Sequence, residues 1–295
     1  MKTKAAPILT GSAAEMSTLE GNCLASRHRG RAFGHAVLLG VVAFFATLAA
    51  AAPINLSPAE SMRIGRKIWQ NECGGTVSGL TSWNTGENFA SLGIGHFIWY
   101  PKGVLGPFDE SFPELASFAA SRNAELPEVV RANRNSGCPW SSRAEFLAAA
   151  DSAEMKQLRQ FLADTVAIQA EFLVLRLQKA LPKMLAEAPA ADRANIERQF
   201  DRTASTPQGC YALVDYVNFK GEGVLETERY NGQGWGLLQV LQGMSGSERG
   251  ASAAREFGTS AAKVLSQRVE NSPSERKESQ WLAGWLKRVK TYAQG

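Results

Sequence analysis

Beyond residue 52, apolar residues recur at intervals of three and four positions along most of the chain, which is the period of one face of an α-helix. The first such segment begins at Ser57, where a proline follows the serine and Glu60 stands three residues after it, a pattern typical of a capped helix start. Its apolar positions continue to Trp69, and two glycines follow from Gly74. We therefore predict a helix that begins at Ser57 and ends at Gly74.

Residues 74–101 have a different pattern. Six glycines separate short apolar runs, which is typical of short strands joined by tight turns. We predict a small β-region here. Residues 101–113 contain several turn-forming residues, with a proline at each end, and are expected to form a loop.

The remainder of the chain has helical spacing. Pro182 is expected to kink or end the longest helical segment, and a Gly-rich stretch interrupts the pattern between residues 221 and 243. The predicted helices cover residues 114–122, 142–150, 153–185 and 190–202, a segment that begins after Thr206 and Pro207, and residues near 248–269 and 273–292. This order predicts one α+β domain over residues 53–295, mostly helical, with a small sheet near its N-terminal end.

Residues 1–52 have the pattern of an export signal. Arg27, Arg29 and Arg31 precede an apolar run at residues 36–49, and the small residues before Pro53 offer cleavage positions. The alternative is an uncleaved membrane anchor, because the run is only slightly short of a spanning helix. In both cases we expect the remainder of the chain outside the cytoplasmic membrane, in the periplasm or secreted.

The net charge of +4 is unevenly distributed. Residues 1–52 hold five of the 32 Lys and Arg residues but only two of the 28 acidic residues, so the rest of the chain is almost neutral. A nucleic-acid-binding protein would show a basic face. We therefore expect no nucleic-acid partner.

Three cysteines, Cys73, Cys138 and Cys210, lie beyond the leader. In an oxidising compartment one pair and one free thiol is an option, but the sequence does not select the pair. His96 is the only histidine after residue 35, so the sequence supports neither a structural zinc site nor a Ser-His-Asp triad. We expect no metal and no cofactor.

Glu72 stands at the end of the first predicted helix, beside the Gly-rich β-region. Cleavage of a glycosidic bond needs a carboxylic acid that is protonated near neutral pH and donates to the leaving oxygen. The partial negative charge of a helix C-terminus and the burial that Trp69 and Cys73 would provide both favour the protonated form. A surface glutamate at a helix end is the alternative interpretation.

Glu72 followed by Ser91 to His96 (SLGIGH) resembles the motif of phage-type lysozymes, in which a glutamate ends a helix and a T/S-x-G-x-G-H sequence closes a β-hairpin. Two weaker similarities follow in the same order. Residues 211–223 look like the core-helix segment of that family, and residues 236–240 are similar to the G-L-M-Q stretch of soluble lytic transglycosylases and goose-type lysozymes. The resemblance implies a lysozyme-like fold and cleavage of peptidoglycan glycan strands.

By this resemblance, Glu72 is the general acid, Ser91 orients the attacking water, and His96 pins the hairpin by hydrogen bonding. The phage-type pattern also has an Asp on the hairpin, which this chain lacks. Glu87 is the only carboxylate between Glu72 and Ser91, so it is either the second catalytic carboxylate or a solvated turn residue. In the second case a lytic transglycosylase with one acid becomes the better interpretation.

Glu222 is a competing candidate for the acid, because it also precedes the G-L-M-Q-like stretch across a Gly-rich segment. Otherwise residues 221–239 are expected to line the opposite wall of the cleft. There the aromatic residues would contact sugar faces and the amides would contact acetamido groups. The expected substrate-binding residues are His96, Glu222, Tyr230, Asn231, Trp235 and Gln239.

We therefore expect a monomeric, muramidase-like glycoside hydrolase of peptidoglycan, which touches a membrane only through an uncleaved leader. The alternatives are a lytic transglycosylase, a non-catalytic glycan-binding envelope protein, and a glycosidase of a related polymer such as chitin. Tyr100 and four of the tryptophans are expected to be packing residues: Trp99, Trp140, Trp281 and Trp285.

Overall fold

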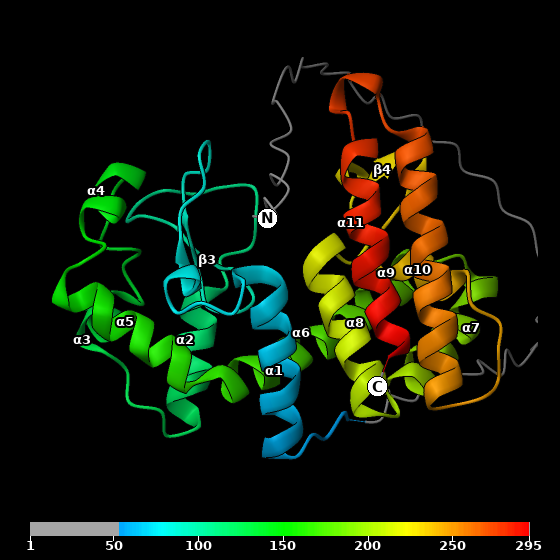
Figure 1. Cartoon of the computed structure of the whole chain (residues 1–295), viewed down its shortest axis with the longest axis horizontal. Coiled ribbons are helices and arrows are strands. Elements are labelled where there is room, and N and C mark those ends of the chain that lie inside the picture. Colours follow the sequence, from blue (N-terminus) through cyan, green and yellow to red (C-terminus); the bar gives the residue numbers. More distant parts are fainter. Residues whose placement is uncertain (1–52, 295) are drawn as a thin grey trace, which may run out of the picture. The chain divides into compact units, whose positions relative to one another are not determined.

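The structure, a computed structural model, describes residues 53–294, and these belong to one compact unit (Figure 1). The predicted export leader lies outside the described residues. Helices dominate, and two small antiparallel sheets accompany them. The expectation of a mostly helical α+β fold is therefore confirmed at this level.

Helix α1 (Pro58–Cys73) begins and ends as its sequence predicts. The Ser57 side chain accepts a hydrogen bond from the Glu60 N–H, and the Glu60 carboxylate accepts one from the Ser57 N–H in return. Gly74 ends the helix in the left-handed conformation, with φ of 63°. The helix packs closely on α6, because a Cβ at Gly65 would lie 2.7 Å from Val166 Cγ1.

The predicted β-region is a three-stranded antiparallel sheet in the order β1-β2-β3, formed by β1 (Thr81–Ser82), β2 (Ala90–Leu92) and β3 (Phe97–Trp99). Leu92 pairs with Phe97, and both are fully buried on the core face. Ser91 pairs with Ser82 and with Ile98, so these three residues share the opposite face. Ser82 and Ile98 are only half-buried there.

The predicted helix over residues 153–185 is two helices, α5 (Ala153–Asp164) and α6 (Val166–Glu187). They separate at Thr165, whose backbone leaves the helical conformation with φ of −102° and ψ of 19°, and its hydroxyl donates to the Phe161 carbonyl. Helix α6 continues past Pro182, which is exposed on its solvent side. Of the two expectations for Pro182, a kink or an end, the end of the helix is therefore wrong.

Helix α8 (Pro207–Lys220) forms the centre of the second half of the chain. Every residue from 209 to 216 is buried, and α1, α6, α7, α9 and α10 all pack on it. Thr206 caps its start, as its sequence predicts. The neighbouring elements are α7 (Ala190–Ala204), β4 (Arg229–Tyr230), β5 (Gln233–Gly234), α9 (Leu237–Gln242), α10 (Ala251–Asn271), α11 (Ser279–Lys290) and the 3-10 helix η4 (Thr291–Ala293).

Three short helices follow the sheet: α2 (Phe112–Ser121), α3 (Glu128–Asn133) and α4 (Arg143–Ala148). Helices α3 and α9, and the β4–β5 hairpin, were not predicted because each is too short to show a period in the sequence.

Within residues 53–294, no helix combines the length and apolar character needed to cross a membrane.

Candidate functional site

Glu72 occupies the second-last position of α1, where side chains from α8 and α11 meet it. Its side chain is 12% exposed. The Oε1 atom accepts a hydrogen bond from Arg288 Nη2 at 2.5 Å and another from Asn218 Nδ2 at 3.3 Å. Among the described residues, nothing hydrogen-bonds to Oε2. One carboxyl oxygen is therefore anchored, and the other has no hydrogen-bond partner among the described residues.

Arg288 is shared between Glu72 and a second carboxylate, Asp215, which is fully buried. Asp215 accepts from Arg288 Nε at 2.8 Å and from Nη2 at 2.7 Å. Burial alone would lower the pKa of the Arg288 guanidinium, but the carboxylates of Asp215 and Glu72 raise it well above the usual value. The guanidinium therefore stays charged, and it holds Glu72 in place through a charge-assisted hydrogen bond.

Two further donors complete the shell of Asp215. Asn71 Nδ2 lies 3.0 Å from Oδ1, and the Tyr292 hydroxyl lies 2.6 Å from Oδ2. Burial, followed by the charge of Asp215, raises the pKa of Tyr292 well above its ordinary value, so its hydroxyl remains a donor. Asp215 is thus a saturated buried acceptor that fixes Arg288 from behind.

A row of alternating cations and aromatic rings runs from this cluster toward the β4–β5 hairpin. The Arg288 guanidinium lies 4.1 Å from the ring centroid of Phe219. Lys220 Nζ lies 4.0 Å from that ring and 3.3 Å from the ring of Trp285. Arg268 follows, 5.2 Å from Trp285. Each cation is stabilised by the negative face of a ring.

The far end of this row holds Tyr230 and Trp235. Arg268 makes two 2.7 Å bonds to Glu278, the Tyr230 hydroxyl donates to Glu278 at 3.0 Å, and the Arg268 guanidinium lies 4.0 Å from the Trp235 ring. Trp235 is only 5% exposed. The structure therefore leaves almost none of its ring for the predicted sugar contact. Trp285, expected to be a packing residue, is buried but also contacts two of these cations.

The hairpin motif lies beside the end of α1. Cys73, next to Glu72, has its sulfur 3.6 Å from the Gly93 carbonyl oxygen and 3.8 Å from His96 Nε2. His96 has a positive φ of 51°, so its backbone makes the turn between β2 and β3. Ser91 shares a sheet face with Ser82 and Ile98, but it is itself buried, with 2% of its surface exposed.

Cys73 is not an activated nucleophile, although its sulfur contacts His96. Burial, with a further contribution from Glu72, raises the pKa of the Cys73 thiol to about 12. The sulfur is therefore a neutral thiol near neutral pH and a poor nucleophile. All three described cysteines are free thiols, so the option of a disulfide is not realised among them.

Glu87 lies in the turn that joins β1 to β2. Its Oε2 accepts from Asn84 Nδ2 at 3.1 Å, and its carbonyl accepts from Trp83 Nε1 at 2.8 Å. The residue is half-buried. These bonds fix the turn, and they leave the second carboxyl oxygen without a hydrogen bond to the described residues.

The other predicted residues are dispersed. Glu222 forms an ion pair with Lys183 of α6 at 3.3 Å, and Asn231 donates to Asn271 on the exposed surface. Gln239 uses its amide internally: Nε2 donates to the Gly223 carbonyl and Oε1 accepts from the Gly236 N–H. Gln239 therefore holds the Gly-rich loop together.

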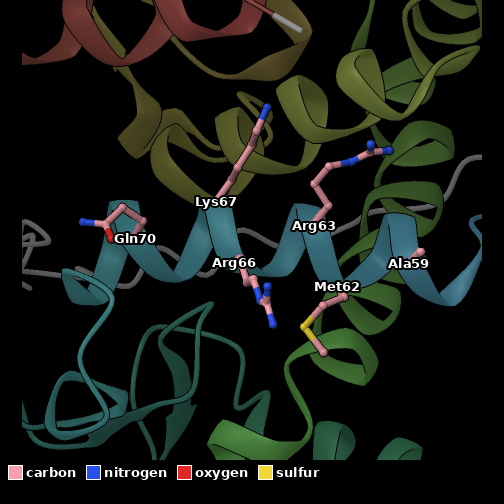
Figure 2. A pocket seen from close by; sticks show the side chains of 6 residues that line it. All are labelled: Ala59, Met62, Arg63, Arg66, Lys67 and Gln70. Atoms are coloured by element: carbon pink, nitrogen blue, oxygen red, sulfur yellow. The ribbon is translucent and has the colours of Figure 1, made fainter.

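The structure has two open hollows whose lining residues do not include Glu72. The first, about 500 Å³, follows the outside of α1, where Figure 2 shows Arg63 and Lys67 pointing to one side of the helix and Met62 and Arg66 to the other. The second, about 460 Å³, lies beside the β4–β5 hairpin, α9 and α10. Gln239 is the only predicted site residue among the residues that line either hollow.

No family model, curated protein or solved structure matches the chain. The resemblance to phage-type lysozymes therefore stays a prediction from short motifs. Within residues 53–294, no group of three or more His, Cys, Asp or Glu side chains is arranged to hold a metal ion.

The most important residues that sequence reasoning missed are Asp215, Lys220 and Arg288. Asp215 had a usable signal, because a carboxylate inside the apolar run of residues 211–217 needs a buried cation or several donors. Arg288 lies 216 residues from Glu72, and nothing in the spacing points to that pairing.

Proposed function

We propose that this chain is a muramidase-like glycoside hydrolase that cleaves the β-1,4 glycan of peptidoglycan outside the cytoplasmic membrane, with Glu72 as the general acid. The observation that supports this most directly is the hydrogen bonding of Glu72. One oxygen is anchored by Arg288 and Asn218, while Oε2 has no partner among the described residues. The hairpin carrying the lysozyme-like motif lies directly beside it.

Glu72 lies in a network of two carboxylates and one guanidinium. Asp215 and Arg288 share two hydrogen bonds, and Arg288 donates a third to Glu72 Oε1. In the proposed reaction Glu72 donates a proton to the leaving oxygen of the glycosidic bond.

The remaining roles follow from the hairpin. Ser91 orients the attacking water from the sheet face that it shares with Ser82 and Ile98. Glu87 is the second carboxylate, which activates the water or stabilises positive charge on the sugar. His96 positions the hairpin against α1 through its contact with Cys73.

A lytic transglycosylase is the second candidate. The observation that favours it is the bond from Asn84 to Glu87, which gives Glu87 a structural role in its own turn. Without a second carboxylate, the substrate's own hydroxyl would close an anhydro ring, and Glu72 alone would move the protons.

The test is release of soluble fragments from purified peptidoglycan by the purified protein and by Glu72→Gln. We expect Glu72→Gln to lose at least about 10²-fold in rate, the usual contribution of a general acid. Glu270→Gln, on the exposed surface of α10, is the matched control. Reducing ends indicate hydrolysis, and anhydro-muramic ends indicate the transglycosylase.

Glu222→Gln decides between the two candidate acids. If Glu72→Gln remains as active as the parent while Glu222→Gln is inactive, Glu222 is the acid and the proposed role of Glu72 is wrong. If the parent binds glycan but releases no product after long incubation, the chain is a non-catalytic glycan-binding protein.

A further inference from the structure

Helix α1 has two opposite faces of different character. Its inner face is buried and packs on α6, with the closest approach at Gly65. Its outer face lines the open hollow of about 500 Å³, and the six lining residues follow the spacing of one side of a helix: Ala59, Met62, Arg63, Arg66, Lys67 and Gln70. We call these six residues the α1 stripe. The α1 stripe contains three cations and no acid.

None of these three cations forms an ion pair with the residues that the structure describes. Arg63 and Arg66 are exposed, and their side chains make no hydrogen bond to the described residues. Lys67 is half-buried. Its Nζ donates to Gln208 Oε1 at 2.9 Å and lies 4.9 Å from the ring centroid of Tyr211, and both of these partners are uncharged.

The acids of α1 are engaged elsewhere. The Glu60 carboxylate accepts from the Ser57 N–H and hydroxyl. These bonds lower the pKa of Glu60 most, and the charge of Arg63 contributes least. Glu72 belongs to the cluster with α8 and α11. Arg63 and Lys67 lie one turn apart, where like charges repel, and burial together with the charge of Arg63 lowers the pKa of Lys67.

The shape of the α1 stripe distinguishes between a small anion and an anionic surface. Figure 2 shows Arg63 and Lys67 on one side of α1 and Arg66 on the other. A helix with its side chains is about 10–12 Å across, so one small anion does not bridge the two sides in these orientations. The hollow is open, and α1 alone lines it, so no second wall encloses a small ligand. A surface that presents many anionic groups meets the cations on both sides at once.

We propose that the α1 stripe docks on the phosphate headgroups of an anionic phospholipid membrane. Each Lys or Arg close to such a surface adds to the electrostatic attraction. The proposed contact is local, because the chain beyond residue 52 is almost neutral as a whole. It is also separate from the glycosidase proposal, since it uses no residue of the cluster around Glu72.

The position of α1 in the chain favours a membrane over other polyanions. The apolar run at residues 36–49, which the sequence predicts to enter a membrane during export, ends nine positions before Pro58. Nine extended residues span at most about 32 Å. The start of α1 is therefore delivered close to a membrane surface, where the three cations would find phosphate groups within reach.

The test is co-sedimentation of the full chain with two kinds of vesicle, phosphatidylcholine alone and equal parts of phosphatidylcholine and phosphatidylglycerol. We expect the preference of the parent for the anionic vesicles to fall about 25-fold in Arg63→Gln/Arg66→Gln, or about fivefold for each cation. Lys156→Gln/Lys263→Gln, which removes two exposed charges from α5 and α10, is the matched control and should keep the preference. All of these proteins carry the same leader, so its own binding is common to the comparison.

The thermal unfolding temperature of Arg63→Gln/Arg66→Gln should equal that of the parent, because neither side chain has a described contact to lose. Three results overturn the assignment: no preference in the parent, a preference that survives the loss of both arginines, or an equal loss in the control. Soluble polyphosphate is the last probe. If it binds in a way that depends on the two arginines while the anionic vesicles are not preferred, the partner is another polyanion and the membrane assignment is wrong. The vesicles contain no glycan, so a failure of the glycosidase proposal leaves this result unaffected.

Discussion

Asp215 and Arg288 share two hydrogen bonds in the interior of the molecule, although they lie 73 residues apart in the sequence. Asp215 comes from α8 and Arg288 from α11, so the pair connects the last α-helix of the described residues to the central one. The same guanidinium reaches Glu72 on α1. The position of the candidate acid is therefore set by a pair in which Asp215 is fully covered, while the side chains of Arg288 and Glu72 are 14% and 12% exposed.

We predict that Asp215→Asn destabilises the protein by about 3–5 kcal/mol, because it removes the charge that compensates a buried guanidinium. The free energy of unfolding in urea measures this. Asp151→Asn, at an exposed position without described contacts, is the control and should change that free energy by less than about 0.5 kcal/mol.

Arg288→Lys should also disturb the site, although it keeps the positive charge. One ammonium cannot reproduce the planar, two-bond contact of the guanidinium with Asp215. Activity is expected to fall in both variants as Glu72 loses its anchored position. An Asp215→Asn protein that is as stable as the parent would show that the pair contributes little.

Ser91 gives a second prediction. If its hydroxyl orients the attacking water, Ser91→Ala should slow hydrolysis about five- to tenfold, the value of one hydrogen bond, while Ser91→Thr keeps the hydroxyl and the activity. Initial rates of reducing-end release measure the effect. Ser82→Ala is the control, because Ser82 occupies the paired position on the same face of the sheet. Equal losses in the two alanine variants would indicate a general effect on the sheet.

Several parts of the fold were predictable because their causes are local. The capping box at Ser57, the cap at Thr206 and the Gly-punctuated sheet each depend on residues within a few positions of one another. The helix end expected at Pro182 was wrong for a different reason. The sequence does not show that its ring points to solvent, where α6 tolerates it.

The candidate site is a prediction whose surroundings were only partly predictable. Glu72 and the hairpin lie within one contiguous segment, so the sequence alone indicates that they are neighbours. The partners that anchor Glu72 come from α8 and α11, and a single sequence does not show which distant helices meet. Trp235 and Gln239 have residue types suited to sugar binding. In the fold, Trp235 is buried, and the Gln239 amide hydrogen-bonds to the Gly-rich loop.

The buried thiols give a prediction about pH. Burial raises the pKa of Cys210 to about 12, whereas the pKa of a thiol in the unfolded chain is about 8.5. The stability linked to this thiol is fully present below the unfolded value and is lost as the pH rises toward the folded value. This is because the unfolded chain gives up its proton first.

The free energy of unfolding should therefore fall between about pH 9 and pH 10, and Cys210 should account for about 1.4 kcal/mol of the fall per pH unit. Cys210→Ala removes this contribution, so its stability should depend less steeply on pH than that of the parent. Urea unfolding at the two pH values measures both slopes. Parallel slopes in the two proteins would mean that Cys210 does not titrate as its burial implies.

Glu87 decides between the two reactions proposed for the site. Glu87→Gln keeps an acceptor for Asn84 Nδ2, so the turn should survive and the thermal unfolding temperature should not change. If the carboxylate takes part in hydrolysis, the rate of reducing-end release should fall about 10²-fold, because an amide neither accepts a proton from water nor stabilises a cationic sugar. Asn84→Ala is the control, because it removes the turn contact and retains the charge of Glu87. An unchanged rate in Glu87→Gln, with anhydro-muramic ends among the products, would assign the single-acid transglycosylase reaction to Glu72.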